Sequence, residues 1–254
     1  MNYALITGAS SGIGYELAKR FAKNGYDVIL VARQENKLVQ FARELEKEYT
    51  IHARVMAIDV SRPDAANEIS KWIQDKSLTV DYLVNNAGFY VKGAFSETRW
   101  EDEQKMILMQ CLNHTRLTKL LLPGMLVRGR GGILNIGSTG SFVPGPYNAV
   151  YCAVKSFVLS FSEALAEEVA CSGVTVTALC PGGIRTTFQD LNNRRGAFFF
   201  PVMDPVKVAE TGFNALMNGK RLVVPGMANK IQVFMVRFIP RKIAARFSAY
   251  LSAK

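Results

Sequence analysis

Hydrophobic and polar positions follow two alternating patterns along this chain of 254 residues. Seven short runs rich in Val, Ile and Leu are mostly continuously apolar, as in strands that are covered on both faces. They predict strands at residues 3–7, 27–33, 53–60, 80–87, 132–138, 174–180 and 221–225. The segments between them have helical periodicity; in residues 14–25, for example, Leu17 and Phe21 lie one turn apart and Gly25 ends the pattern. Strands that alternate with helices predict an α/β fold with a doubly wound parallel sheet.

No linker, repeat or low-complexity segment divides the chain, so we expect a single domain over residues 1–254. No uninterrupted apolar run approaches the roughly eighteen residues of a membrane-spanning helix. The N-terminal sequence MNYALITGAS lacks the basic and apolar regions of a secretory signal, which favours a cytoplasmic protein. The four cysteines have no C-x-x-C spacing and the two histidines fit no ligand pattern, so we expect free thiols and no metal site.

A glycine-rich turn follows the first predicted strand. The sequence TGASSGIG at residues 7–14 runs directly into a predicted helix. Glycines let the backbone approach a pyrophosphate closely, and a helix N-terminus supplies free N–H groups and the positive end of the helix dipole. Because a second strand ends about twenty residues later, the turn predicts a Rossmann-type dinucleotide site. The expected cofactor contacts in this turn are Gly8, Ser10, Ser11, Gly12, Ile13 and Gly14.

The end of the second predicted strand indicates which dinucleotide binds. NAD sites have an acidic residue there for the ribose 2′-hydroxyl, whereas this chain has Ala32 followed by Arg33. An arginine suits the 2′-phosphate of NADP, and Ser10 is a second donor. We therefore expect NADP(H), with NAD less favoured; the alternative is that Arg33 is only a solvated charge at a helix start.

Three tyrosines precede a lysine by four residues: Tyr15, Tyr151 and Tyr250. Tyr15 follows the glycine turn on a helix that must pack against the sheet, and Tyr250 lies near the end of the chain. Tyr151 instead follows the fifth strand, which ends at Ser138. Ligands collect beyond the carboxyl ends of parallel strands, so the pair Tyr151 and Lys155 is the candidate for chemistry.

Four features together resemble the short-chain dehydrogenase/reductase family: the glycine turn, NNAG at residues 85–88, a serine thirteen residues before Y-x-x-x-K, and PG at residues 181–182 followed by Thr186. The resemblance covers residues 3–190. It implies cofactor contacts at Asp59, Val60, Asn86, Ala87, Gly88, Tyr151, Lys155, Pro181, Gly182, Ile184 and Thr186. The NNAG sequence has a second interpretation, in which its side chains lock neighbouring strands together.

The resemblance also implies catalytic roles for Ser138, Tyr151 and Lys155. Tyr151 would protonate the carbonyl oxygen, Ser138 would hydrogen-bond that oxygen, and Lys155 would hold the nicotinamide ribose. A tyrosine that works near neutrality needs its pKa depressed by about three units, or roughly 4 kcal/mol. A positive charge about 4 Å away supplies about 4 kcal/mol at an effective dielectric near 20. We therefore expect Lys155, one helical turn away, to lower the pKa of Tyr151.

The chain departs from the family at one catalytic position. The family often has an asparagine thirteen residues before the proline of the helix that precedes the fifth strand. Here that proline is Pro123 and the position is Gln110, whereas Asn113 lies one turn further along. Either residue could take the role, or the proton-relay water could be held in another way.

The activity we expect is NADP(H)-dependent interconversion of a carbonyl and an alcohol on a small molecule. Residues 188–202 fall where the family has its substrate lid; Phe198, Phe199 and Phe200 beside Arg194 and Arg195 favour a hydrophobic, acyl-chain or sterol-like substrate. The alternative for these phenylalanines is anchoring of the lid to the core. The alternative function is a non-catalytic NADP-binding sensor, which the missing asparagine would suit.

The net charge of +10 belongs to the C-terminal part of the chain. No acidic residue follows Glu210, whereas eight Lys or Arg residues lie between Lys220 and Lys254. Residues 228–254 predict two basic helices separated by Pro240, with Ile243, Phe247, Tyr250 and Leu251 on one face. Such a tail contacts a membrane surface, its own domain or a sister subunit. We expect a homodimer or homotetramer, and no nucleic-acid partner because no binding motif is present.

Overall fold

The computed structural model describes residues 2–184 and 202–252 of the chain. Its centre is a seven-stranded parallel sheet with the order β3-β2-β1-β4-β5-β6-β7. The strands are β1 (Tyr3–Thr7), β2 (Asp27–Ala32), β3 (Ala53–Ala57), β4 (Val80–Asn85), β5 (Gly131–Ile136), β6 (Val174–Leu179) and β7 (Leu222–Val223). The strand order reverses between β1 and β4, which is the switch point of a doubly wound sheet. The predicted fold class and all seven predicted strands are confirmed.

Two hydrophobic cores cover the two faces of the sheet. On one face, side chains such as Ile6 and Leu30 pack against α1 (Gly12–Lys23), α2 (Glu35–Glu48) and α7 (Pro205–Met217). On the other face, Leu5 and Ile29 pack against α3 (Ala65–Asp75), α5 (His114–Arg128) and α6 (Ala149–Glu168). Successive residues of a strand point to opposite faces, so a strand buried on both sides must be apolar at every position. This explains the continuous apolar runs of the sequence.

A long helical rod leads into β5. It consists of α4 (Trp100–Ile107), a π-helical segment η1 (Leu108–Asn113) and α5. A short 3₁₀ helix, η2 (Thr139–Phe142), follows β5 and leads towards α6. π-Helical insertions frequently occur at functional sites, and this one contains Gln110.

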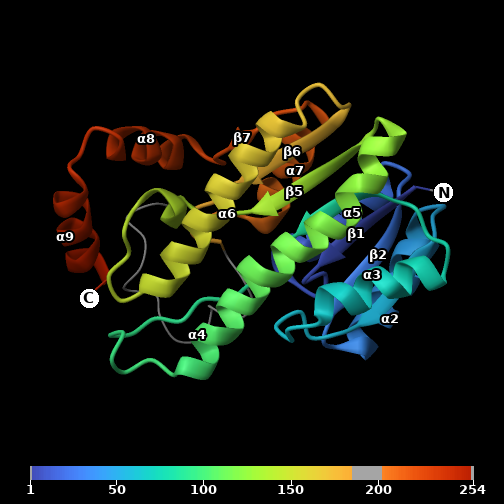
Figure 1. Cartoon of the computed structure of the whole chain (residues 1–254), viewed down its shortest axis with the longest axis horizontal. Coiled ribbons are helices and arrows are strands. Elements are labelled where there is room, and N and C mark those ends of the chain that lie inside the picture. The colour runs from blue at the N-terminus through green and yellow to red at the C-terminus, as the bar shows by residue number, and fades with distance from the viewer. Residues whose placement is uncertain (1, 185–201, 253–254) are drawn as a thin grey trace.

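The C-terminal part forms α8 (Met227–Val236) and α9 (Arg241–Ser252), with Pro240 between them as predicted. Figure 1 shows both helices at the left end of the molecule, beyond the β7 edge of the sheet. Only α8 contributes to a described core, because Val233 packs with Leu159, Cys180 and Val224. The tail is therefore attached to the body through one face of α8.

One helix in the described part of the chain, α6, has the length and the mean hydropathy (1.4) that crossing a membrane would need. The sequence interpretation had found no such segment, because Lys155 and Glu163 interrupt the apolar run. One face of this helix is buried inside the protein; Val158 and Leu165, for example, lie on it. Its position against the sheet is that of a core helix.

Candidate active site

The glycine turn between β1 and α1 requires glycine for steric reasons. Gly8 and Gly12 have φ angles of +68° and +58°, in the left-handed region that favours glycine. A Cβ atom on Gly14 would lie 2.3 Å from the carbonyl oxygen of Gly8. The side chain of Ser11, the N-cap of α1, makes no capping hydrogen bond, so the first N–H groups of the helix keep the geometry of an anion site. Ser10 and Ile13 lie in the same turn.

Asn86 holds this turn from the neighbouring strand. Its Nδ2 donates to the carbonyl oxygens of Thr7 at 2.9 Å and Gly8 at 3.2 Å. The backbone N–H groups of Asn86 and Ala87 both donate to the hydroxyl of Thr7, at 3.0 and 3.1 Å. The preceding Asn85 donates to Asn135 on β5 at 3.0 Å. These contacts support the structural interpretation of the NNAG sequence and bring Gly88 close to the switch point.

Arg33 and Asp59 follow the neighbouring strands β2 and β3. Arg33 is exposed, so its guanidinium can reach a ligand. Burial acts to raise the pKa of the Asp59 carboxyl, but hydrogen bonds from the N–H and hydroxyl of Ser61 and the nearby Arg33 charge lower it below its ordinary value. Val60 is buried next to it. This end of the sheet is where the adenosine part of a dinucleotide lies in a doubly wound fold.

Ser138, Tyr151 and Lys155 come together beyond the carboxyl end of β5. Ser138 is the N-cap of η2, and its Oγ accepts a hydrogen bond of 3.0 Å from the N–H of Gly140. Tyr151 and Lys155 lie on the first turns of α6, with the Lys155 Nζ 5.8 Å from the centroid of the Tyr151 ring. Ser138 also hydrogen-bonds the phenol of Tyr151. The structure therefore assembles the three residues that the sequence singled out.

The expected depression of the Tyr151 pKa by Lys155 is wrong for this structure. Burial raises the pKa of the phenol above its ordinary value of 10, and the hydrogen bond with Ser138 lowers it only partly. The lysine charge is directed elsewhere, because Nζ donates a hydrogen bond of 2.7 Å to the carbonyl oxygen of Ile136. Tyr151 thus keeps its proton at neutral pH, as a proton donor must.

Lys155 is almost completely buried, with 6% of its surface exposed. Burial lowers the pKa of its ammonium group to about 8, although Cys180 and Cys111 act in the opposite direction. The buried His114 lies nearby; burial first, and then the Lys155 charge, lower the pKa of its imidazole to about 3. His114 is therefore neutral, and Lys155 is the positive charge of the site.

The structure separates the two candidates for the missing asparagine. Gln110 lies in η1 with 2% of its surface exposed, and its Nε2 donates to the carbonyl oxygen of Phe89 at 3.3 Å. Its Oε1 is buried and has no hydrogen-bond partner. Asn113 is committed elsewhere, because it bonds the N–H of Ala66 and the carbonyl oxygens of Val60 and Arg62. Of the two residues, Gln110 is thus the one with a free side-chain acceptor. A relay water held in another way stays the third alternative.

The segment from Pro181 to Ile184 passes the same edge of the sheet. The carbonyl oxygen of Pro181 accepts from the N–H of Thr139 at 2.9 Å. A Cβ atom on Gly182 would lie 2.6 Å from Oδ1 of Asn229 on α8, so a larger residue here would displace the Asn229 side chain. Ile184 forms an isolated parallel bridge with Met203. Thr186 and residues 188–201 of the expected lid lie outside the described residues.

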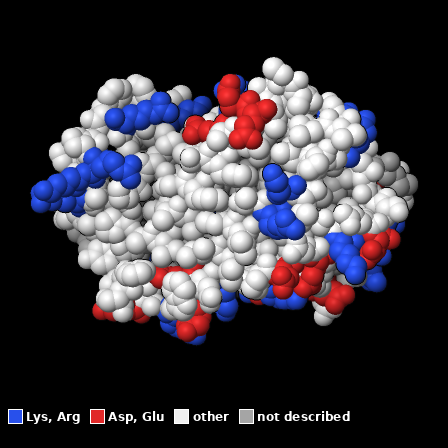
Figure 2. All heavy atoms as spheres, viewed as in Figure 1, with Lys and Arg blue, Asp and Glu red and all other residues white. Residues whose placement is uncertain are grey.

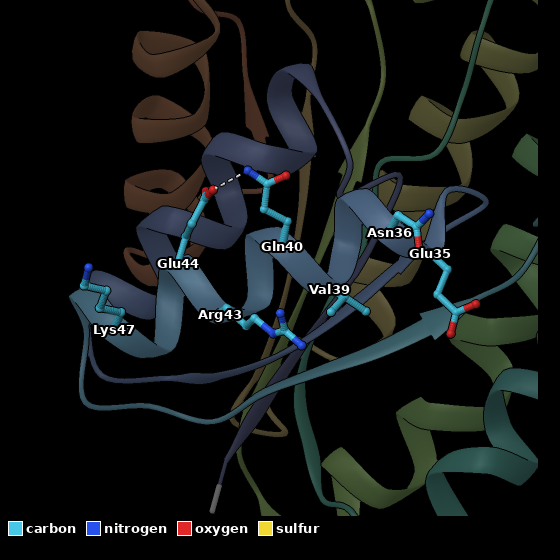
Figure 3. Close-up of a pocket in the computed structure, with 7 residues that line it drawn as sticks. All are labelled: Glu35, Asn36, Val39, Gln40, Arg43, Glu44 and Lys47. Carbon is cyan, nitrogen blue, oxygen red and sulfur yellow. Dashed lines mark hydrogen bonds between the residues drawn. The ribbon is translucent and has the colours of Figure 1, made fainter.

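Tyr15, which follows the glycine turn after β1, has a packing role. The Tyr15 ring stacks on Phe41 of α2 with a centroid distance of 3.9 Å. A shallow hollow lies along the outer face of the same helix α2, as Figure 3 shows. Seven residues of this one helix line it, and none of Ser138, Tyr151 and Lys155 is among them: Glu35, Asn36, Val39, Gln40, Arg43, Glu44 and Lys47. We therefore do not assign the hollow to the reaction.

Two residues of the site were missed by the sequence interpretation. Ser141 Oγ donates to the carbonyl oxygen of Lys155 at 2.8 Å and accepts from the N–H of Ser138 at 3.2 Å, so it joins the two elements. The ring of Tyr90 lies edge-on to Tyr151 with a centroid distance of 5.9 Å. Ser141 could have been found in the sequence, because it is a serine three residues after the N-cap Ser138. The only sequence signal for Tyr90 was its position two residues after NNAG.

Comparisons with known proteins agree with this geometry. The family model described as short chain dehydrogenase matches residues 2–196. The very-long-chain 3-oxoacyl-CoA reductase of Homo sapiens is 34% identical over 188 residues, which are 72% of this chain and 60% of that protein. The chain spans 53 to 60% of the length of the first three curated relatives of this name.

Solved structures match over nearly the whole chain. A 7β-hydroxysteroid dehydrogenase has a TM-score of 0.90 at 26% identity, covering 98% of this chain and 96% of that one. A short-chain dehydrogenase from Sphingobium yanoikuyae in complex with NADPH has a TM-score of 0.82 at 29% identity, covering 94% and 93%. With the glycine turn, the assembled Ser138, Tyr151 and Lys155, and the family match over residues 2–196, this chain belongs to the short-chain dehydrogenase family.

Proposed function

We propose that this protein is an NADP(H)-dependent oxidoreductase that interconverts a carbonyl and an alcohol. The observation that carries the proposal is the meeting of the Ser138 hydroxyl, the Tyr151 phenol and the buried Lys155 ammonium beyond β5. The glycine turn after β1 and the Asn86 contacts that hold it support a dinucleotide at the same edge of the sheet. The relatives reported above carry names of reductases and dehydrogenases.

The geometry suits reduction with Tyr151 as the acid. The nicotinamide, when bound, supplies the hydride that reduces the carbonyl carbon. Tyr151 holds its proton because burial raises the pKa of the phenol, and it donates that proton to the carbonyl oxygen. Ser138 hydrogen-bonds the same oxygen and fixes its distance from the phenol. Lys155 supplies the positive charge of the site and, as the family resemblance implies, would hold the nicotinamide ribose.

NADP(H) is favoured over NAD by Arg33. It is exposed directly after β2, where NAD sites have an acidic residue, and its charge is available for a 2′-phosphate. The solved relative that contains NADPH supports the same choice.

We propose a hydrophobic carbonyl compound with a long acyl chain as the substrate class. The support is the set of relatives named very-long-chain 3-oxoacyl-CoA reductase, together with the match to a 7β-hydroxysteroid dehydrogenase. Residues 188–202 first suggested this substrate class. Of these residues the structure describes only Val202, which is half exposed.

The location and assembly state complete the proposal. We place the enzyme in the cytoplasm, as a homodimer or homotetramer, in peripheral contact with a membrane surface. Exposed apolar side chains on the helical rod and α6, such as Leu112 (48%) and Phe157 (41%), support assembly of copies because large apolar side chains of this kind gather at interfaces. Size-exclusion chromatography with light scattering measures the number of subunits.

The activity is tested by the decay of NADPH absorbance with 3-oxoacyl thioesters of increasing chain length. We expect turnover that rises with chain length, little turnover with NADH, and a loss of at least about 10²-fold in Tyr151→Phe. Equal turnover at all chain lengths would contradict the proposed substrate class but not the proposed reductase activity. Tight NADPH binding without turnover of any carbonyl would instead favour the non-catalytic sensor.

A further inference from the structure

The described part of the chain after Glu210 exposes a stripe of large apolar side chains along α8. Met227, Ile231, Phe234 and Phe238 follow one another at spacings of four, three and four residues, so they lie on one face of the helix and of the turn after it. Their exposed fractions are 70, 57, 57 and 70%. Monomeric proteins rarely leave an apolar stripe of this kind without a function.

A second stripe lies on α9. Ile243 and Phe247 are one turn apart and are 56 and 60% exposed; Tyr250, three residues later, is also 60% exposed. Ala244, next to Ile243, is buried, whereas these three side chains are exposed. The tail thus presents two amphipathic helices in succession.

The body of the protein already uses the opposite face of α8. Val233 is buried in the cluster with Leu159, Cys180 and Val224. Asn229 is buried as well and donates to the carbonyl oxygen of Pro225 at 2.8 Å. The stripe is therefore not the docking face of the helix on its own domain, which was one of the alternatives left open by the sequence.

Basic side chains flank both stripes. Five exposed residues of α8, α9 and the turn between them carry positive charge, and none forms an ion pair within the described residues: Lys230, Arg237, Arg241, Lys242 and Arg246. Figure 2 shows Lys and Arg at the left end of the molecule, where Figure 1 has α8 and α9, and no acidic side chain there. The sequence after Glu210 has no Asp or Glu at all.

We propose that these two stripes, with their basic flanks, form a docking surface for an anionic phospholipid bilayer. Apolar side chains enter the boundary between headgroups and acyl chains, and neighbouring Lys and Arg bind acidic headgroups, each contributing about 1 kcal/mol. Packing of the tail against the same tail of a second copy would bring two sets of uncompensated positive charge together. A bilayer satisfies the apolar and the basic side chains at once.

The docking surface adjoins the site. Asn229, on the inner face of α8, lies directly against Gly182 in the segment that leads past the proposed nicotinamide position. Its Nδ2 also contacts the sulfur of Met203 at 3.3 Å. This inference extends the proposed peripheral location. It does not depend on the reductase activity, because lipid binding and NADPH oxidation are measured separately.

The test is sedimentation of the full chain with phosphatidylcholine vesicles, with and without phosphatidylserine. We expect wild type to sediment with the anionic vesicles and to be released by salt. Two double variants separate the components: Phe234→Ser with Phe238→Ser, and Arg237→Glu with Arg241→Glu. Each should weaken binding to anionic vesicles at least about tenfold.

Matched controls keep the result specific. Lys47→Glu with Lys71→Glu, on α2 and α3, changes the net charge equally, and Val127→Ser removes another exposed apolar side chain (89%). Both should bind like wild type, and all variants should keep the wild-type melting temperature and NADPH affinity. Wild type that stays in the supernatant, or tail and control variants that sediment equally, would overturn the proposal. So would loss of a dimer in Phe234→Ser with Phe238→Ser, since it would assign the stripe to a second copy.

Discussion

Lys155 donates its hydrogen bond to the carbonyl oxygen of Ile136, at 2.7 Å, and not to the phenol of Tyr151 one helical turn away. The ammonium is thus anchored to the end of β5, the strand that leads to Ser138. A buried charge with a single backbone partner costs free energy, and that cost is visible in its lowered pKa. The site holds its positive charge in place before any ligand arrives.

Replacement of this lysine should stabilise the protein. The pKa of Lys155 is about 8 in the fold against 10.5 when exposed, a difference worth about 3 kcal/mol below pH 8. Lys155→Met removes this cost but leaves the Ile136 carbonyl unpaired, so we expect a net gain of about 1–2 kcal/mol at pH 7 in urea unfolding without nucleotide, with activity lost.

The pH dependence of this gain has a defined sign. Between pH 8 and 10.5 the unfolded lysine binds more protons than the folded one, so wild-type stability rises with pH in this window. The advantage of Lys155→Met should therefore shrink and disappear towards pH 10.5. A constant advantage across that window would contradict the buried-charge explanation.

Reductive activity should fall as the pH rises through about 8. Tyr151 stays protonated there because burial raises its pKa, whereas Lys155 loses its charge in this range. We expect kcat/KM for reduction to be flat at lower pH and to decrease about tenfold for each unit above 8. Measurement at saturating NADPH removes effects on cofactor binding. A profile that stays flat to pH 9.5 would show that the lysine charge is not required.

Gln110 should act as a positioning residue that a shorter amide can replace. Its Nε2 bonds Phe89, and its unpartnered Oε1 leaves one acceptor in the site. Gln110→Ala should lower kcat by about 10²-fold, at the lower limit of what proton-transfer groups contribute, with little change in the KM for NADPH. Gln110→Asn should recover most of the rate. If the alanine variant lost only stability, the residue would have a packing role.

Arg33 should control the choice of nucleotide. Loss of a charge-assisted hydrogen bond costs about 1.5–3 kcal/mol, so Arg33→Gln should raise the Kd for NADPH about 10- to 100-fold. The Kd for NADH should hardly change because NADH has no 2′-phosphate. Isothermal titration with both nucleotides measures the difference, and Arg43→Gln on the outer face of α2 is the control. An equal loss of affinity for both nucleotides would mean that Arg33 does not bind the 2′-phosphate.

The fold could be predicted because its signals are local and repeated. Runs rich in apolar residues marked every strand, and the errors lay at strand ends: β3 and β4, for example, stop at Ala57 and Asn85, before the loops that carry Asp59 and Asn86. Three residues of the candidate site, Ser138, Tyr151 and Lys155, were also predictable, since they lie at intervals fixed by β5, η2 and α6.

The electrostatics of the site could not be predicted in the same way. Spacing along α6 correctly placed Lys155 one turn from Tyr151, but it gave no information on burial or on the competing carbonyl of Ile136. The sequence could not decide between Gln110 and Asn113 for a similar reason. It depends on partners about fifty residues away, at Val60 and Arg62, which only the packed structure brings to Asn113.

The bridge between Ile184 and Met203 also bears on changes of chain length between these two residues. The N–H of Met203 donates to the carbonyl oxygen of Gly183 at 2.8 Å, so the chain leaves and re-enters the scaffold at nearly the same point. Lengthening a loop whose ends are already joined costs only about 0.6 kcal/mol per doubling. We therefore expect changes of chain length between these two anchors to leave Ser138, Tyr151 and Lys155 in place.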